Sequence, residues 1–261
     1  MTDFNDRSEA EAAKYALPFA RVVERVRPER MSNNRKPRRE YWWQFAERAA
    51  GMREAVSPLS EVLVIARVSK TVMPLRVPTG QVPSEACVVF ATDSYGDQAI
   101  LSSSLHQLWA ITYGSGLRND PRYTPSDVFE TFPRPRVTEM LGRIGRVLEE
   151  QRREIMSRRD LGLTKLYNLV NDPSVHDDGD ADRIREIHAD LDERVMESYG
   201  WSDLNLGHGF HTYRKMRRWT VSPAARTEIL DRLLEENHRR ATSNRPDRNG
   251  EVPREDGTLF S

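Results

Sequence analysis

The spacing of apolar residues divides the chain into two parts that meet near residue 136. In the first part, apolar residues gather in short runs, which is typical of buried strands. We expect strands over 61–68, 71–77, 86–92 and 98–101. Helices are expected over 9–28 (with a kink or a late start at Pro18), 41–55 and 102–113. The stretches 30–39 and 114–135 are rich in basic, Pro or Gly residues and are expected to be loops.

Beyond residue 136 the apolar residues recur every three or four positions, as on one face of an amphipathic helix. One stripe covers 140–155 and a second covers 184–199, while Ser222-Pro223 begins a third helix. The chain is therefore predicted to be α+β. We expect a mixed α/β domain with a short-stranded sheet over 1–136, a helical domain over 137–240 and a disordered polar tail over 241–261.

Charge is balanced over the whole chain but not along it. The 261 residues include 40 basic and 40 acidic side chains, so no global field attracts a polyanion. Residues 21–54 nevertheless carry ten basic and five acidic side chains, 137–200 carry ten and fifteen, and 201–240 carry eight and five. This asymmetry is compatible with one face for nucleic acid and another for solvent or a partner.

The single cysteine and the lack of long apolar runs narrow the class of protein. Cys87 lies in an apolar run and is expected to be a small buried hydrophobe. A lone cysteine excludes an internal disulfide and a cysteine-based zinc cluster. No apolar run reaches the length of a membrane span and no signal peptide is visible, so a cytoplasmic protein without a membrane partner is expected.

A basic stretch followed by aromatic residues is the first candidate site. Arg35, Lys36, Arg38 and Arg39 directly precede Tyr41-Trp42-Trp43. Such cations can contact DNA phosphates whatever the sequence. The alternative is a solvated basic turn whose aromatic residues enter the core. Trp42, Trp43 and Trp109 are expected to build the scaffold and not to touch bases.

A second candidate site lies where the strand over 61–68 ends. Strand alternation places Arg67 and Ser69 on one face, with Lys70 in the turn beyond. This cluster suits a phosphate or a guanine edge, although an ordinary polar hairpin tip has the same pattern. Ser104 and His106, at the start of the helix over 102–113, could bind a phosphate or simply cap the helix.

No catalytic constellation is visible in the sequence. The stretch 119–123 resembles the Asn-Pro-Pro-Tyr motif of amino-methylating enzymes but lacks its adjacent Asn-Pro-Pro. No Gly-rich turn suits S-adenosylmethionine, so no cofactor is expected in this chain. His208 and His211 are better explained as a structured loop than as a metal site, and 177–182 as an acidic linker that ends in a helix start.

Taken in order, a dozen short segments resemble one family. They are Ala12-Ala13-Lys14-Tyr15, Arg27-Pro28, Asn34-Arg35-Lys36, Trp42-Trp43, 67–70, 105–110, 119–125, 129–133, 163–168, Tyr199-Gly200-Trp201, 203–211 and 233–239. They are similar to the target recognition domain and C-terminal helical region of MmeI-like (type IIL) bifunctional DNA methyltransferase–restriction enzymes and related phage-defence methylases. The stretch 129–133 is the most specific part of this resemblance.

The resemblance implies a sequence-specific DNA recognition module that lacks the catalytic methyltransferase and nuclease domains. The expected partners are double-stranded DNA and an adenine-specific methyltransferase domain or subunit, in cis or in trans, which would hold S-adenosylmethionine. Asn119 and Arg122 join Arg67, Ser69, Lys70, Ser104 and His106 as candidates for DNA contact or for bracing the recognition loops. The alternative is a protein–protein docking module that uses the acidic 137–200 region and the terminal Leu259-Phe260.

Overall fold

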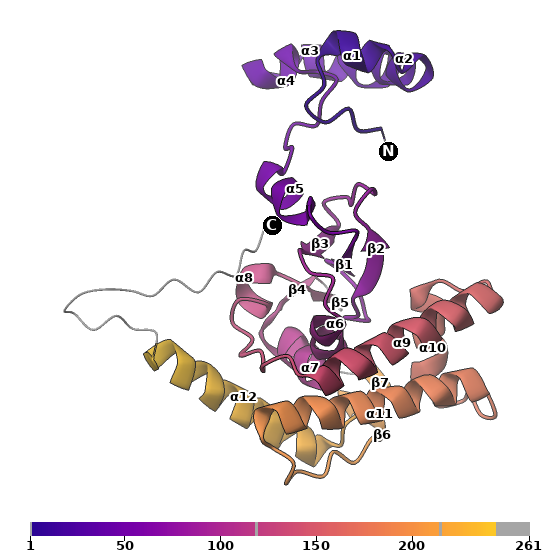
Figure 1. Cartoon of the computed structure of the whole chain (residues 1–261), viewed down its shortest axis with the longest axis vertical. Helices are drawn as coiled ribbons and strands as arrows, with labels where there is room; N and C mark the ends of the chain where they lie inside the picture. Colours follow the sequence, from indigo (N-terminus) through magenta and orange to yellow (C-terminus); the bar gives the residue numbers. More distant parts are fainter. Residues whose placement is uncertain (1, 118–119, 214–215, 244–261) are drawn as a thin grey trace.

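The computed structural model describes residues 2–117, 120–213 and 216–243, and its fold is α+β (Figure 1). The helices are α1 (Glu9–Ala13), α2 (Ala16–Arg25), α3 (Arg27–Met31), α4 (Lys36–Glu40), α5 (Ala50–Val56), α6 (Tyr95–Ser102), α7 (Ser104–Tyr113), α8 (Pro125–Val128), α9 (Glu139–Arg158), α10 (Leu163–Asn171), α11 (Gly179–Tyr199) and α12 (Pro223–Ser243). The strands are β1 (Glu61–Ala66), β2 (Leu75–Pro78), β3 (Cys87–Phe90), β4 (Ser115–Leu117), β5 (Asp120–Arg122), β6 (Gly209–Tyr213) and β7 (Met216–Thr220). None of the described helices has both the length and the apolar character needed to cross a membrane.

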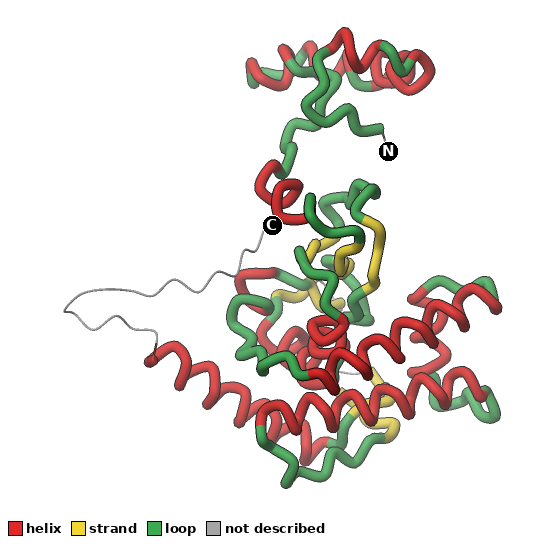
Figure 2. Tube along the Cα trace, in the orientation of Figure 1, coloured by secondary structure: helices red, strands yellow, loops and turns green. Residues whose placement is uncertain are grey.

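Helices α1–α4 form an arm at one end of the molecule, and Figure 2 shows that a loop connects this arm to α5. The arm has its own aromatic cluster, in which Phe19 contacts both Phe4 and Trp42 at ring-centroid distances of 5.8 and 5.6 Å. Trp43 donates a hydrogen bond from Nε1 to the Arg7 carbonyl. Trp42 and Trp43 therefore build the scaffold, as predicted.

The arm differs from expectation in how its helices are divided. The single helix expected over 9–28 is wrong, because it is divided into α1, α2 and the start of α3. The first break lies at Lys14–Tyr15 and not at Pro18, which lies in the first turn of α2, where no donor is needed. The loop expected over 30–39 is wrong at both ends, because its first two residues belong to α3 and its last four to α4. Pro37 lies in the first turn of α4, and a proline there is compatible with a helix.

The central sheet is antiparallel with strand order β2-β1-β3. Leu63 and Ile65 of β1 point into the core, while Val64 and Ala66 lie on the opposite face. The strand expected over 98–101 is wrong, because this stretch belongs to α6. The Ser94 side chain caps α6 by accepting a hydrogen bond from the Asp97 amide.

The helical part packs directly on the sheet domain. One cluster of buried side chains extends across residue 136, from Leu63 of β1 to Leu233 of α12. The stripes expected over 140–155 and 184–199 form α9 and α11, whose buried faces pack against each other. Asp178 caps the start of α11, which explains the acidic stretch before it. The expected tail beyond residue 243 lies outside the described residues.

Two glycines of α9 offer a matched test of this packing. A Cβ at Gly145 would lie 1.9 Å from the carbonyl oxygen of Tyr95 in α6, whereas a Cβ at Gly142 would meet nothing within 4 Å. We expect Gly145→Ala to force α6 and α9 apart and to lower the free energy of unfolding by about 1–3 kcal/mol. Gly142→Ala should raise it by about 0.5–1 kcal/mol, because alanine restricts the unfolded chain. Urea denaturation measures both values. If Gly145→Ala leaves the free energy of unfolding unchanged, the close approach of α6 to α9 is contradicted.

Candidate nucleic-acid interface

Two candidate segments that are distant in sequence lie side by side in the fold. Residues 67–69, just after β1, run antiparallel to 121–123 at the end of the β4–β5 hairpin. The Ser69 amide donates to the Pro121 carbonyl at 3.3 Å, and the Tyr123 amide donates to the Arg67 carbonyl at 2.7 Å. The candidates Arg67, Ser69 and Lys70 thus lie beside the candidate Arg122, and these four residues are called the hairpin edge.

Lys70 and Arg122 are the available cations of this edge. Both side chains are exposed, and neither forms an ion pair with a carboxylate of the described chain. Arg67 is half-buried, and its Nε donates to the Glu85 carbonyl at 2.8 Å. Ser69 Oγ accepts a hydrogen bond from the Thr71 amide. Arg67 and Ser69 therefore hold the loop in place, while Lys70 and Arg122 can meet a polyanion.

Direct DNA contact by Ser104 and His106 is a prediction that the structure corrects. His106 is fully buried and Ser104 is 8% exposed. The Ser104 amide donates to the buried carboxylate of Asp192 at 2.7 Å. The sequence placed both residues correctly at a helix start, but Ser103 caps that start and the helix is packed inside the molecule.

His106 instead braces this edge, which is the alternative role that the sequence allowed. Its Nδ1 lies 2.8 Å from the Leu101 carbonyl, so Nδ1 must carry the proton. Nε2 then accepts a hydrogen bond from the Tyr123 hydroxyl at 3.0 Å. Burial lowers the pKa of His106 to about 4, so the ring is neutral near pH 7. Tyr123 in turn bonds the Arg67 carbonyl, which connects this brace to the cationic edge.

The structure does not bring the first basic candidates to this edge. Arg35, Lys36, Arg38 and Arg39 lie at or in α4, at the end of the molecule away from β4 and β5 (Figure 1). Arg39 donates to the Asn33 carbonyl at 2.6 Å, and Lys36 pairs with Glu40 at 3.5 Å. Arg35 and Arg38 have no carboxylate partner in the part of the chain that the structure describes. The candidate Asn119 lies outside the described residues.

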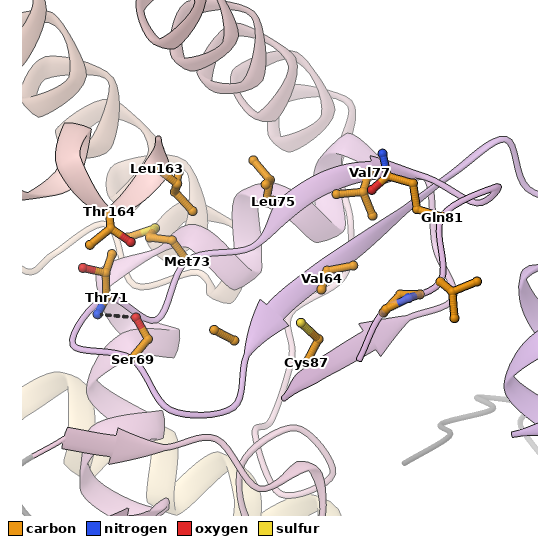
Figure 3. A pocket seen from close by; sticks show the side chains of 13 residues that line it. Val64, Ser69, Thr71, Met73, Leu75, Val77, Gln81, Cys87, Leu163 and Thr164 are labelled. Atoms are coloured by element: carbon orange, nitrogen blue, oxygen red, sulfur yellow. Dashed lines mark hydrogen bonds between the residues drawn. The ribbon is translucent and has the colours of Figure 1, made fainter. Parts of the chain in front are cut away.

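An apolar pocket of about 310 Å³ borders the loop after β1 (Figure 3). Its floor is the outer face of the sheet, and its rim includes Ser69 and Thr71. Leu163 and Thr164, at the start of α10, close one side. Cys87 of β3 lines the pocket and is half-buried, whereas a buried cysteine was expected.

The histidines at 208 and 211 serve the fold of their loop. His208 Nε2 lies 2.8 Å from the Asp192 carboxylate, and His211 Nε2 lies 3.0 Å from the Gly207 carbonyl. Burial lowers the pKa of His208, but the hydrogen bond and charge of Asp192 outweigh this effect and raise it above its usual value. Within the described ranges, no group of three or more His, Cys, Asp or Glu side chains is arranged to hold a metal ion.

The described chain is thus an α+β module in which main-chain pairing and the His106–Tyr123 hydrogen bond hold two exposed cations in place. The sequence profile described as "MmeI, target recognition domain" matches residues 4–136, which is half of the chain. The chain belongs to this family.

One solved structure extends the likeness in fold beyond the family match. It is the type IIL restriction-modification enzyme MmeI in complex with DNA, with a TM-score of 0.60 and 19% sequence identity. The match covers 92% of this chain and 28% of that one, so the chain spans just over a quarter of the enzyme's length. No curated protein matches the chain in sequence.

Proposed function

We propose that this chain recognises a specific DNA sequence for a restriction-modification or phage-defence adenine methyltransferase. The observation that carries the proposal is the pairing of residues 67–69 with 121–123, which presents Lys70 and Arg122 together from a family target recognition domain. Arginine can bind guanine bidentately in the major groove, and lysine can bind a phosphate or a base acceptor. Because the supporting bonds are fixed by the fold, these cations meet DNA in a defined register.

In this proposal the chemistry belongs to another part of the enzyme. A methyltransferase domain or subunit, joined in cis or in trans, would hold S-adenosylmethionine and the target adenine. The adenine would be flipped out of the duplex, since its amino group cannot be reached inside the stack. The chain described here would choose the site at which that happens.

The arm would contribute phosphate contacts that do not depend on sequence. Arg35 and Arg38 are suited to this role because neither is neutralised by a carboxylate within the described ranges. Lys36 and Arg39 would assist, although Lys36 is paired with Glu40 and Arg39 is bonded to Asn33. The arm is far from the hairpin edge in Figure 1, so the two contacts would meet separate segments of a duplex.

Selection of bound duplexes from a randomised library tests the proposal with the intact chain. Enrichment of one short motif is expected. We further expect Arg122→Ala to weaken binding to that motif by about 5- to 150-fold and to relax preference at one position, as for loss of a base contact. The double variant Arg35→Ala with Arg38→Ala should weaken binding to all duplexes alike and lower the slope of log K against log salt by about 1.8.

Arg183→Ala provides a control, because it removes an exposed cation of α11 that is already paired with Glu186. It should leave the motif and the salt slope unchanged. Binding by the intact chain without enrichment of any motif would contradict sequence recognition. Absence of DNA binding would contradict the proposal as a whole and favour a docking module.

A further inference from the structure

The cationic edge continues into the C-terminal half through an unbroken series of contacts. Ser69 and Thr71 share a pocket with the start of α10 (Figure 3), and α10 packs against β7. At the far end of the β6–β7 hairpin, the Tyr213 hydroxyl lies 2.8 Å from Thr112 Oγ1 at the end of α7. The chain then turns into β4, where Ser115 pairs with Arg122. These contacts form a closed ring, so α10 and the β6–β7 hairpin adjoin the loop after β1 and the β4–β5 hairpin.

The hairpin is held on both faces, which fixes its position relative to this ring. On one face Phe210 and Trp219 pack at a ring-centroid distance of 5.4 Å, and the Arg185 guanidinium of α11 lies 4.9 Å from the Phe210 ring centroid. On the other face the Tyr213 ring lies 4.4 Å from the Arg226 guanidinium of α12. A hairpin supported in this way can present a side chain without first becoming ordered.

Two cations of this part of the ring are available to a ligand. Lys165 in the first turn of α10 and Arg217 in β7 are exposed, and neither pairs with a carboxylate in the described ranges. Other arginines of the C-terminal half, such as the exposed Arg183 and Arg239 and the half-buried Arg194, are held by Asp or Glu side chains. Most acidic side chains of 137–200 are therefore engaged in internal ion pairs, and none of those in the described ranges neutralises Lys165.

The start of α10 adds to this positive character. Gly162 occupies the cap position, and among the described residues no side chain accepts a hydrogen bond from the first-turn amides. Uncapped amides and the helix dipole both favour an anion near Lys165. Together with Lys70 and Arg122, the two C-terminal cations give the ring four exposed positive side chains, from the loop after β1, β5, α10 and β7.

We infer that Lys165 and Arg217 form a second phosphate contact on the same duplex whose bases face Lys70 and Arg122. This inference rests on the proposed function and extends it. It assigns DNA contact to α10 and the β6–β7 hairpin, both outside the stretch that matches the family profile. The helical half would thus contact the DNA backbone beside the hairpin edge, in addition to supporting the protein core.

The test is the salt dependence of binding to the selected duplex, measured with the full chain. Lys165→Ala with Arg217→Ala is expected to lower the slope of log K against log salt by about 1.8 and to leave the enriched motif unchanged. The change in affinity between 50 and 200 mM salt would then shrink by about 12-fold relative to the wild type. Arg183→Ala with Arg239→Ala removes the same formal charge from paired positions and should leave the slope unaltered.

The outcomes separate this inference from the proposed function. An unchanged slope in the Lys165/Arg217 variant, with a lowered slope in Lys70→Ala, would overturn the inference and leave DNA recognition intact. If the Arg183/Arg239 control lowers the salt slope equally, the effect comes from the net charge of the chain, and the inference is also overturned. If the wild-type chain binds no duplex, both the proposed function and the inference fail.

Discussion

Replacement of Glu149 by alanine is expected to lower the free energy of unfolding by about 3–5 kcal/mol, the cost of breaking a buried ion pair by removing one partner. Glu149 is 4% exposed and accepts hydrogen bonds from Gln98 at 2.6 Å and from Arg152 at 3.0 Å. Arg152 is fully buried, and Glu149 is its only carboxylate partner in the described chain. Without Glu149, the folded state would contain a guanidinium with neither water nor a counter-charge.

Urea denaturation of the two proteins measures this loss directly. Glu150→Ala is the matched control, because Glu150 is the next residue of α9 but is exposed. Its substitution should change stability by less than about 0.5 kcal/mol. A loss of under 1 kcal/mol in Glu149→Ala would show that Arg152 finds another partner and that the ion pair does not organise the contact between α6 and α9.

Acidification from pH 7 to pH 5 is expected to destabilise the fold by about 4 kcal/mol through two buried histidines. His106 and His188 have pKa values lowered by burial to about 4, against 6.5 for an exposed histidine. Between these two values the unfolded chain binds a proton at each ring and the folded chain does not, so stability falls as the pH falls. Each histidine contributes about 2 kcal/mol at pH 5.

His208 acts in the opposite direction, because its pKa is raised. Its stabilising contribution is present below the unfolded pKa and is lost as the pH rises through the folded pKa, so it offsets part of the acid effect. Denaturation at pH 7 and pH 5 measures the net change. In His188→Gln, where glutamine can still bond to the Tyr167 hydroxyl, the pH-dependent loss should shrink by about half. An identical pH dependence in that variant would rule out His188 as a source.

The long helices could be predicted from sequence because their apolar stripes have a helical period. Met140, which is partly exposed, and the buried Leu141 and Ile144 show this period over α9. The same method failed at 98–101, since α6 is buried on nearly all sides and therefore shows no polar face. A short run of buried residues cannot be assigned to a helix or a strand by periodicity alone.

The candidate edge was predictable in its parts but not in its assembly. Lys70 could be chosen because it follows the end of an expected strand, and Arg122 because it lies in the stretch 119–125 that carries the family resemblance. Their meeting depends on hydrogen bonds between segments more than 50 residues apart, which no local pattern encodes. His106 was misjudged for the same reason, because its burial comes from Leu101 and from the distant Tyr123. Arg217 lies in a basic run, 214–218, that could have signalled the C-terminal contact.

The bonds that join residues 67–69 to 121–123 involve main-chain atoms only. Side chains at positions 70 and 122 therefore have no part in holding the two segments together. If Lys70 and Arg122 contact DNA as proposed, their side chains could be exchanged, and with them the preferred DNA site, while the main-chain pairing and the His106–Tyr123 hydrogen bond stay in place. Because the main-chain pairing does not depend on the side chains at positions 70 and 122, a new DNA preference could arise by few substitutions without loss of stability.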